Sequence, residues 1–343
     1  MDSKERSTIL QIQRLSTEDG PGIRTTVFFK GCSLKCSWCQ NPESITIVPQ
    51  IQWMESRCIG CRTCIEVCPE NALSLTEDGM QVNRKLCTNC GVCSEACPST
   101  AMELLGTIWG LDDLVREVEK DRVYFEKSGG GITASGGEPV VQANFVALFF
   151  QRLKEMGIHT ALDTCGFYSE KVLDKVLPYS DMVLYDVKEI DPAKHNVFTG
   201  QSNELIFNNL IHIYNYMKTH DTPGALWVRT PIIPGATERE ENITGIGTFI
   251  ATHLGGGVAR WELCSFNNLC RDKYLRLGLD WTFKESPLLT KNRMEELVKF
   301  ARASGVDPDI VSWSGPTQVE KNDTINEGRN SDSEISDNRS AAI

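Results

Sequence analysis

The stretch GCSLKCSWCQNP, residues 31–42, places three cysteines within eight positions, spaced C-x3-C-x2-C, and the next cysteine is Cys58. Three thiolates on one short loop can hold three irons of a 4Fe-4S cubane and leave the fourth iron open. A structural cluster needs a fourth thiolate, so an iron without a thiolate indicates a substrate site. Catalytic zinc centres likewise keep one coordination position open, whereas structural zinc sites do not. Cys32, Cys36 and Cys39 are therefore candidate ligands of a catalytic cluster.

A second cysteine-rich segment follows, with eight cysteines between Cys58 and Cys97. CIGCRTCIEVCP and CTNCGVCSEACP are two copies of C-x2-C-x2-C-x3-C-P, the spacing of a bacterial two-cluster ferredoxin. In such ferredoxins the fourth cysteine of each run binds the other cluster. The alternative is a pair of zinc sites, which more often join two C-x2-C pairs across a longer gap. We assign one 4Fe-4S cluster to Cys58, Cys61, Cys64 and Cys97, and a second to Cys87, Cys90, Cys93 and Cys68.

Composition limits the possible functions. The chain has 343 residues, enough for one barrel-sized domain and a small second module, and its formal net charge of −11 argues against nucleic-acid binding. The charged start MDSKERSTIL lacks the apolar segment of a signal peptide, and no apolar run is long enough to span a bilayer. We expect a cytoplasmic monomer without nucleic-acid or membrane partners, in which the scattered Cys165, Cys264 and Cys270 pack in the core.

Outside residues 51–104, short β-branched runs alternate with helical apolar stripes, which is the pattern of a parallel sheet built from βα units. Helices are predicted around Leu111–Val118, Phe145–Leu153 and Ile206–Met217, with N-caps at Ser169 and Thr290 and a helix end at Gly157. We expect six strands, at Thr25–Lys30, Gly131–Ser135, His159–Thr164, Asp181–Val187, Ala225–Ile233 and Arg260–Phe266.

Six such units predict an α/β fold, a partial (β/α)6 TIM-like barrel with an inserted ferredoxin-like domain. The barrel comprises residues 1–50 and 105–315, and the insert with its two 4Fe-4S clusters comprises residues 51–104. Residues 316–343 are polar and have no aromatic residue or apolar period, which predicts a disordered tail.

Polar or glycine-rich segments follow the predicted strands. In a parallel α/β barrel the functional groups gather at the carboxyl ends of the strands, where the βα loops meet. The first strand leads into the three-cysteine loop, and the fifth carries Arg229. The others end in SGGEP (135–139), DTCG (163–166), DVK (186–188) and FNN (266–268). Their coincidence on one rim predicts a single active site there.

The cluster spacing resembles that of the radical S-adenosylmethionine (SAM) superfamily. DGPGIRTTVFFKGC, residues 19–32, is similar to the signature of the glycyl-radical-enzyme activating enzymes, and the two-cluster insert is similar to the branch that serves partners other than pyruvate formate-lyase. The resemblance covers about residues 10–315. It implies that a 4Fe-4S cluster cleaves SAM reductively to a 5′-deoxyadenosyl radical, which abstracts a hydrogen from a backbone glycine of a glycyl-radical enzyme. Flavodoxin or ferredoxin would supply the electron.

The resemblance also implies roles for individual residues. Asp19, which would meet the partner's glycine loop, and Lys188 are the candidate catalytic residues, and Lys188 and Arg229 would contact the carboxylate and ribose regions of SAM. Asp163 with Thr164, and Asp186, match a monovalent-cation site. The further cofactor-binding candidates are Trp38, the loop Ser135, Gly136, Gly137 and Glu138 for the methionine amino group, and Asn267 near the adenine.

Two positions depart from the family pattern, and several alternatives stay open. The family often has His at the positions of Gln40 and Asn267; Asn keeps a hydrogen-bonding amide but lacks a stacking ring.

Asp19 could instead cap its own Gly-Pro-Gly turn. The insert could be a structural plug rather than an electron relay. The runner-up function is a radical SAM enzyme that modifies a peptide or sulfatase side chain, and a ferredoxin fused to an inert barrel is the non-enzymatic alternative.

Overall fold

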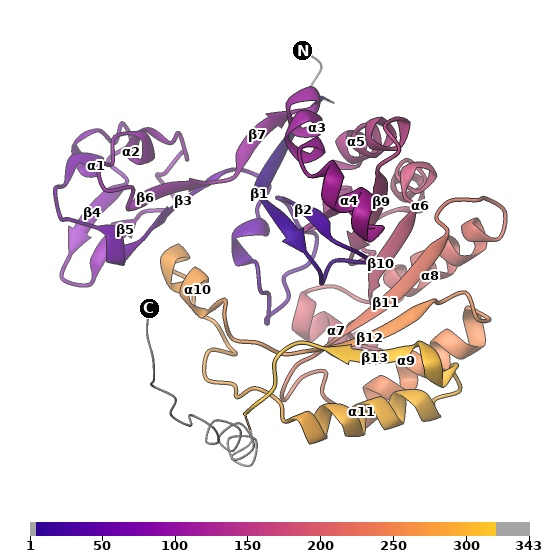
Figure 1. The fold of residues 1–343 in the computed structure, drawn as a ribbon. Helices are drawn as coiled ribbons and strands as arrows, with labels where there is room; N and C mark the ends of the chain where they lie inside the picture. The colour runs from indigo at the N-terminus through magenta and orange to yellow at the C-terminus, as the bar shows by residue number, and fades with distance from the viewer. Residues whose placement is uncertain (1–4, 320–343) are drawn as a thin grey trace, which may run out of the picture.

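The computed structural model describes residues 5–319. Within them, a nine-stranded sheet forms the larger part of the molecule, in the order β13-β12-β11-β10-β9-β8-β2-β1-β7 (Figure 1). Adjacent strands from β2 to β13 pair in parallel. The sheet curves but stays open between β13 and β7, so the predicted partial barrel is confirmed.

All six predicted strands are present, and they lie side by side in chain order. Five of them are mostly buried on both faces, as expected for parallel strands covered by helices, whereas β11 alternates between buried and partly buried residues. Their bounds are β2 (Arg24–Phe29), β8 (Gly131–Gly136), β9 (His159–Thr164), β10 (Met182–Asp186), β11 (Ala225–Ile232) and β12 (Arg260–Ser265).

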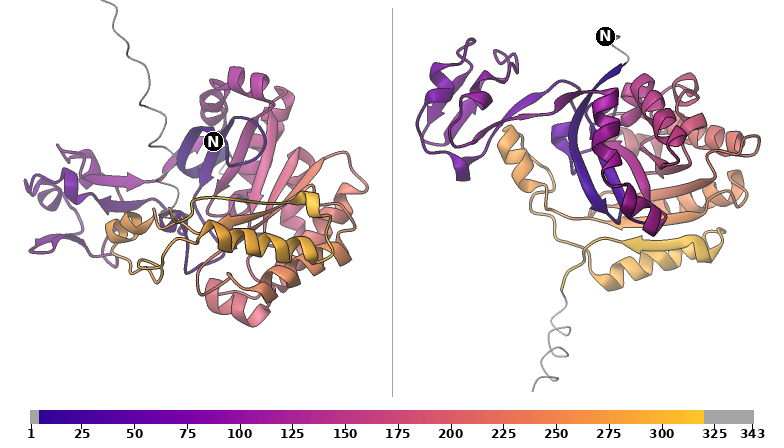
Figure 2. Two further views of the ribbon diagram at one scale, coloured as in Figure 1. Left: turned by 60° about the horizontal axis from the view of Figure 1, so that its bottom comes forward. Right: turned by 45° about the horizontal axis from the view of Figure 1, so that its top comes forward.

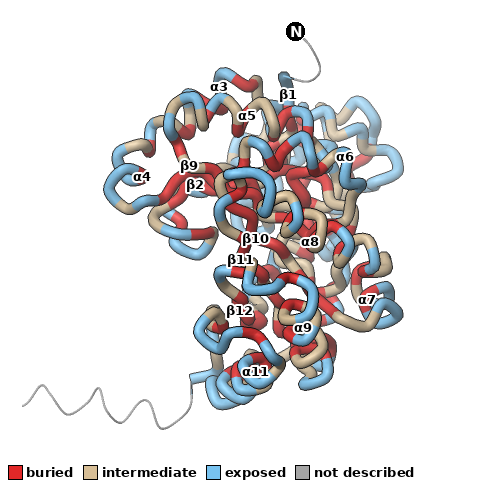
Figure 3. Tube along the Cα trace, turned by 90° about the vertical axis from the view of Figure 1, so that its right-hand side faces the viewer, coloured by how far each residue is buried: buried red, intermediate tan, exposed pale blue. Residues whose placement is uncertain are grey.

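Helices cover the outer face of this sheet, and Figure 3 shows the buried strands enclosed by helices with exposed outer sides. The predicted helix end at Gly157 has a φ of +71° and two capping bonds, from Gly157 N to Lys154 O and from Ile158 N to Leu153 O. The predicted N-cap Thr290 accepts a bond from Arg293 N. The covering helices are α3 (Leu111–Glu119), α4 (Arg122–Ser128), α5 (Ala143–Glu155), α6 (Glu170–Leu173), α7 (Pro192–Thr199), α8 (Glu204–Met217), α9 (Glu240–His253) and α11 (Lys291–Ala303).

Three strands of the sheet were not predicted. β1 (Arg6–Ser16) pairs antiparallel with both β2 and β7 (Thr107–Gly110), and β13 (Val311–Ser314) extends the parallel part. Bulges interrupt the pairing of β1 with β2 after Ile9 and after Gln13, so the sequence of this strand lacks a regular alternation of apolar and polar residues. β7 and β13 have only four residues each, too few for a clear pattern.

The insert projects from the barrel on two antiparallel strands, β3 (Gln50–Trp53) and β6 (Met102–Leu105). It also holds a hairpin, β4 (Leu73–Thr76) with β5 (Gly79–Val82), and two single-turn helices, α1 (Thr63–Glu66) and α2 (Val92–Glu95). Each helix lies within one cysteine run and contains its third cysteine, Cys64 in α1 and Cys93 in α2, which reflects the internal repeat.

A segment between β12 and α11 packs beside the cluster loop. It contains α10 (Arg271–Leu277), and Figure 2 shows α10 between the insert and the barrel. Its aromatic side chains form a second buried cluster with Trp38, in which Tyr274 stacks on Trp281 with ring centroids 5.3 Å apart.

The described part of the predicted tail lies against the barrel. Ser265 Oγ donates to Pro316 O over 2.7 Å, and Gln318 N donates to Leu289 O over 2.8 Å. The rest of that prediction, residues 320–343, lies outside the described residues. No helix within residues 5–319 combines the length and apolar character needed to cross a bilayer.

Candidate active site

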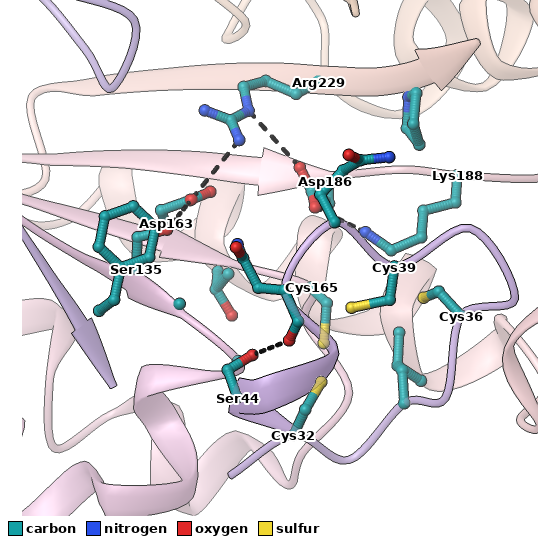
Figure 4. A pocket seen from close by; sticks show the side chains of 18 of the residues that line it. Cys32, Cys36, Cys39, Ser44, Ser135, Asp163, Cys165, Asp186, Lys188 and Arg229 are labelled. Atoms are coloured by element: carbon teal, nitrogen blue, oxygen red, sulfur yellow. Dashed lines mark hydrogen bonds and ion pairs between the residues drawn. The ribbon is translucent and has the colours of Figure 1, made fainter. Parts of the chain in front are cut away.

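A cavity of about 300 Å³ opens at the carboxyl ends of the parallel strands. It brings together segments that lie far apart in the sequence, and Figure 4 shows its side chains converging from the cluster loop and from the strands. Its lining residues are Asp19, Phe28, Cys32, Leu34, Cys36, Trp38, Cys39, Gln40, Asn41, Ser44, Ser135, Gly136, Gly137, Asp163, Thr164, Cys165, Asp186, Lys188, Arg229, Pro231 and Cys264.

Backbone hydrogen bonds hold the three-cysteine loop over this cavity. At its start, Gly31 N donates to Ser44 O over 2.7 Å, and Cys32 N donates to Ile45 O over 3.0 Å. Further along, Lys35 N and Ser37 N donate to the last carbonyls of α7. The loop is thus held at its start and in its middle, and Cys32, Cys36 and Cys39 all line the cavity.

The glycine turn after β8 faces the loop at close range. A Cβ added to Gly137 would lie 2.3 Å from Gly31 O, and a Cβ on Gly136, which has a φ of +113°, would lie 2.5 Å from backbone atoms of Phe29. Only glycine allows this approach, because any side chain would push the turn away from the loop. The turn therefore presents bare backbone to the cavity.

Four charged side chains on neighbouring strands form one network in the cavity. Lys188 Nζ lies 2.6 Å from Asp186 Oδ2, and Arg229 Nη2 lies 3.5 Å from Asp163 Oδ2 (Figure 4). Ser135 Oγ donates to the same Asp163 oxygen over 2.6 Å. Arg229 Nε is buried 3.6 Å from Asp186 Oδ1, beyond hydrogen-bond range, and finds no acceptor among residues 5–319. An anionic ligand would supply the missing acceptor.

The charges of this network follow from burial and from its own members. Burial raises the pKa of Asp163 to about 6, and neighbouring Asp186 adds to the rise while Arg229 and the Ser135 bond oppose it. Burial also acts to raise the pKa of Asp186, but Lys188 and Arg229 hold it below its usual value. Burial would lower the pKa of Lys188, yet Asp186 holds it above the usual value. The network therefore favours the charged forms of Asp186, Lys188 and Arg229 and leaves Asp163 as the weaker acid of its two carboxyl groups.

Asp19 reaches the cavity from the turn before β2. Its Oδ2 accepts bonds of 2.6 Å from both Ser16 Oγ and Thr26 Oγ1, whereas no donor within residues 5–319 reaches Oδ1. The turn requires glycine at position 22, because its φ is +70° and a Cβ there would lie 2.4 Å from Gly130 N. Asp19 thus closes its own turn through Oδ2, while its Oδ1 has no donor among residues 5–319.

The insert groups its eight cysteines around two small cavities. The first quartet, around one cavity, is Cys58, Cys61, Cys64 and Cys97, and the second quartet, around the other, is Cys68, Cys87, Cys90 and Cys93. Each quartet therefore contains the fourth cysteine of the other run, as the ferredoxin spacing predicts. Backbone amides support both crossing residues: Ala72 N donates to Cys68 Sγ over 3.3 Å and Met102 N to Cys97 Sγ over 3.5 Å.

Comparison with known proteins shows the family. A family described as "4Fe-4S dicluster domain" matches residues 57–101, and one described as "Radical SAM superfamily" matches residues 84–244. The trans-4-hydroxy-L-proline dehydratase activating enzyme of Clostridioides difficile is 38% identical over 304 residues, covering 88% of this chain and 98% of that protein. The chain belongs to the radical SAM activating enzymes of glycyl-radical enzymes.

Two further relatives show the range of partners served by such activating enzymes. The (2S)-3-sulfopropanediol dehydratase activating enzyme of Klebsiella oxytoca is 39% identical, covering 83% of this chain and 89% of that protein. The indoleacetate decarboxylase activating enzyme of Tractidigestivibacter scatoligenes is 35% identical, covering 89% of this chain and 97% of that protein. This activating enzyme therefore aligns with its relatives over both the barrel and the insert.

Two predicted site residues of the activating enzyme do not line the cavity. The Glu138 side chain is fully buried behind the glycine turn, where it accepts bonds from Thr164 Oγ1 and Cys165 N, so it fixes the turn from behind. Asn267 Oδ1 accepts a bond from Leu269 N within its own turn. Gln40, the other departure from the family pattern, lines the cavity and donates to Asn267 O over 3.0 Å, so the two departures are in contact.

Sequence reasoning missed other residues of this activating enzyme's site. Cys165 and Cys264, expected in the core, line the cavity, and Figure 4 shows the Cys165 sulfur beside that of Cys32. Their place at the ends of β9 and β12 was the available signal. Lys273 and Tyr274 hold the cluster loop from α10: Tyr274 OH donates to Cys39 O over 3.0 Å, and Lys273 Nζ lies 2.7 Å from Glu43 Oε1. No motif marked either residue.

Proposed function

We propose that this protein binds one 4Fe-4S cluster at Cys32, Cys36 and Cys39 and SAM beside it, and that it installs a radical on a backbone glycine of a partner enzyme. The single observation that carries the proposal is the arrangement of three thiols on one side of a cavity whose other side is polar and charged. Four thiols would saturate a cluster, whereas three leave one iron for a ligand.

The residues around the cavity fit SAM. The bare backbone at Gly136 and Gly137 can approach a ligand's amino group, and a side chain at either position would block it. Arg229, whose Nε lacks a hydrogen-bond acceptor among residues 5–319, and Lys188 supply positive charge for the methionine carboxylate. Asp163, Thr164 and Asp186 offer oxygen atoms for a monovalent cation beside that carboxylate.

A reduced 4Fe-4S cluster held by Cys32, Cys36 and Cys39 would supply the electron for reductive cleavage of SAM to methionine and a 5′-deoxyadenosyl radical, the species that would remove one hydrogen from the partner's glycine. The protein's own task is to hold the reactants in line and to exclude water. Trp38, on the cluster loop, packs against Phe198 and Phe283 and presents an apolar surface to the cavity. Asp19, which lines the cavity, would accept bonds from backbone N–H groups of the partner's glycine loop through its Oδ1.

The insert, in this proposal, binds two further 4Fe-4S clusters and passes electrons from flavodoxin or ferredoxin to the catalytic cluster. Support comes from the two cysteine quartets and from the match to the dicluster family. Such clusters can have low reduction potentials, and reductive cleavage of a sulfonium requires a low reduction potential.

The proposal is tested with anaerobically reconstituted protein, SAM and titanium(III) citrate. We expect methionine and 5′-deoxyadenosine in equal amounts. The partner is then sought by electron paramagnetic resonance in a panel of glycyl-radical enzymes, chosen from those named by the relatives: trans-4-hydroxy-L-proline dehydratase, (2S)-3-sulfopropanediol dehydratase, indoleacetate decarboxylase, isethionate sulfite-lyase and choline trimethylamine-lyase. Absence of SAM cleavage in protein with full iron content would refute the proposal.

A further inference from the structure

The two cysteine quartets lie at different distances from the barrel along the β3–β6 ladder. Gln50 pairs with Leu105 at one end of this ladder, and Trp53 pairs with Met102 at the other. The Leu105 end adjoins the barrel, because Gly106 and β7 follow directly and a Cβ on Gly106 would lie 2.3 Å from Lys30 Cδ. Figure 1 shows the ladder leading from the barrel to the insert.

Each quartet contacts its own step of the ladder. The cavity of the second quartet is lined by Ile51, whose partner Leu104 lies 3.2 Å from the Cβ position of Gly91. The cavity of the first quartet is lined by Trp53 and Met102. Two residues of a strand span about 7 Å, so the second quartet lies closer to the barrel than the first.

The helix α10 connects the second quartet to the cluster loop. On the insert side, α10 lies against β3, and Arg84, three positions before Cys87, donates to Leu277 O over 3.4 Å and to Ile51 O over 2.5 Å. On the barrel side, Tyr274 contacts the backbone of Cys39, and Lys273 contacts Asn41 and Glu43. A single seven-residue helix therefore touches both the second quartet's segment and the catalytic loop.

We infer that the two insert clusters act in a fixed order, in which the second quartet's cluster passes the electron to the catalytic loop across α10 and the first quartet's cluster receives it from the donor protein. This inference rests on the proposed function and specifies its electron path. One electron leaves a reduced flavodoxin or ferredoxin for each SAM cleaved, and no other co-reactant is needed. The first quartet is the entry point because the ladder holds it farther from the barrel.

The order is tested by magnetic interaction between clusters, which weakens steeply with distance. In fully reduced wild-type protein without SAM, the catalytic cluster's paramagnetic resonance signal should show faster spin relaxation caused by its nearest neighbour. Cys90→Ala, which removes a ligand of the second quartet, should abolish this enhancement. Cys61→Ala, at the matching position of the first quartet, should retain it; both cysteines are exposed, so the two variants are comparable.

Gln81→Ala, an exposed change on β5, is the control and should leave all three signals unaltered. If an alanine variant loses both insert clusters, Cys87→Ser and Cys58→Ser are compared instead, because a serine oxygen can still bind iron. Loss of the enhancement in the first-quartet variant alone, or in neither variant, would overturn the order. Failure of the wild-type protein to cleave SAM would instead refute the proposed function. The relaxation data would still show which of the two quartets lies nearer the catalytic cluster.

Discussion

The catalytic loop and the insert both gather cysteines, but they enclose different kinds of space. Each insert quartet surrounds a small cavity lined by apolar side chains such as Ile51, Leu73 and Met80. The three loop cysteines face a larger cavity that is also lined by three carboxylates, a lysine and an arginine. A saturated ligand set in an apolar pocket suits a group that only exchanges electrons, whereas an unsaturated set facing charges suits one that binds a polar substrate. The number of thiols and the surroundings together distinguish the two kinds of site.

Removing one thiol from the open site should have the largest effect. Cys36→Ala should abolish formation of 5′-deoxyadenosine, because the catalytic cluster loses one of its three ligands. Iron content should fall by about one third, since the insert keeps its two clusters. Cys270→Ala is the matched control: Cys270 is buried beside the loop, outside the cavity, and its loss should leave most of the iron and activity. Retained SAM cleavage in Cys36→Ala would show that the open site lies elsewhere.

Removing ligands from both closed sites should affect one electron source more than the other. With Cys58→Ala and Cys87→Ala combined, turnover with reduced flavodoxin should fall by about tenfold or more, a change in barrier of about 1.4 kcal/mol. Turnover with titanium(III) citrate should fall much less, because a small reductant can reach the catalytic cluster directly. Parallel assays with the two reductants, at matched catalytic-cluster content, measure the difference. Equal slowing with both reductants would show that the insert has a structural role and does not transfer electrons to the catalytic loop.

Changing Asp19 tests whether the open site also receives the partner. In Asp19→Asn the bonds from the partner's N–H groups lose their charge assistance, a loss of about 1 kcal/mol or about fivefold in radical yield. SAM cleavage without partner should persist, and Glu18→Gln, an exposed neighbour, should behave as wild type. The glycyl radical is counted by paramagnetic resonance. A yield that falls only in step with cluster content or melting temperature would make Asp19 a turn-closing residue, as its bonds to Ser16 and Thr26 also allow.

The smallest effect is expected where α10 meets the loop. Tyr274→Phe removes the hydrogen bond to Cys39 O and should lower the free energy of unfolding by about 0.5–1.5 kcal/mol, with little change in SAM cleavage. Chemical denaturation of the reconstituted protein measures the change. Tyr124→Phe, at a half-exposed position on α4, is the control. Equal midpoints for the two variants would show that the α10 contact does not stabilise the loop.

The sequence predicted the barrel strands and the rim residues because each depends on a local pattern. Buried parallel strands are short apolar runs, and their carboxyl ends meet wherever the sheet is parallel, so Ser135, Asp163, Asp186 and Arg229 converge. The ferredoxin repeat likewise determined which cysteines share a quartet.

The rest depends on contacts that no local pattern encodes. The backbone at Gly136 turns at a positive φ, and the Glu138 side chain points behind the turn rather than into the cavity. Tyr274 reaches Cys39 across 235 positions of sequence through an unremarkable polar helix. Cys165 and Cys264 had the small apolar character of core residues, and only their place at strand ends brings them to the cavity.

The most direct test of the account is the glycyl radical itself. The reduced, reconstituted protein is incubated anaerobically with SAM and each candidate partner, beside Cys36→Ala at equal protein concentration, and the partner's paramagnetic resonance spectrum is recorded. We expect a glycyl doublet on one partner, a stoichiometric amount of 5′-deoxyadenosine, and neither with the variant. A doublet of equal intensity with Cys36→Ala, or SAM cleavage that never transfers a radical to a glycine in any partner of the panel, would contradict the central claim that the open three-cysteine site generates a glycyl radical.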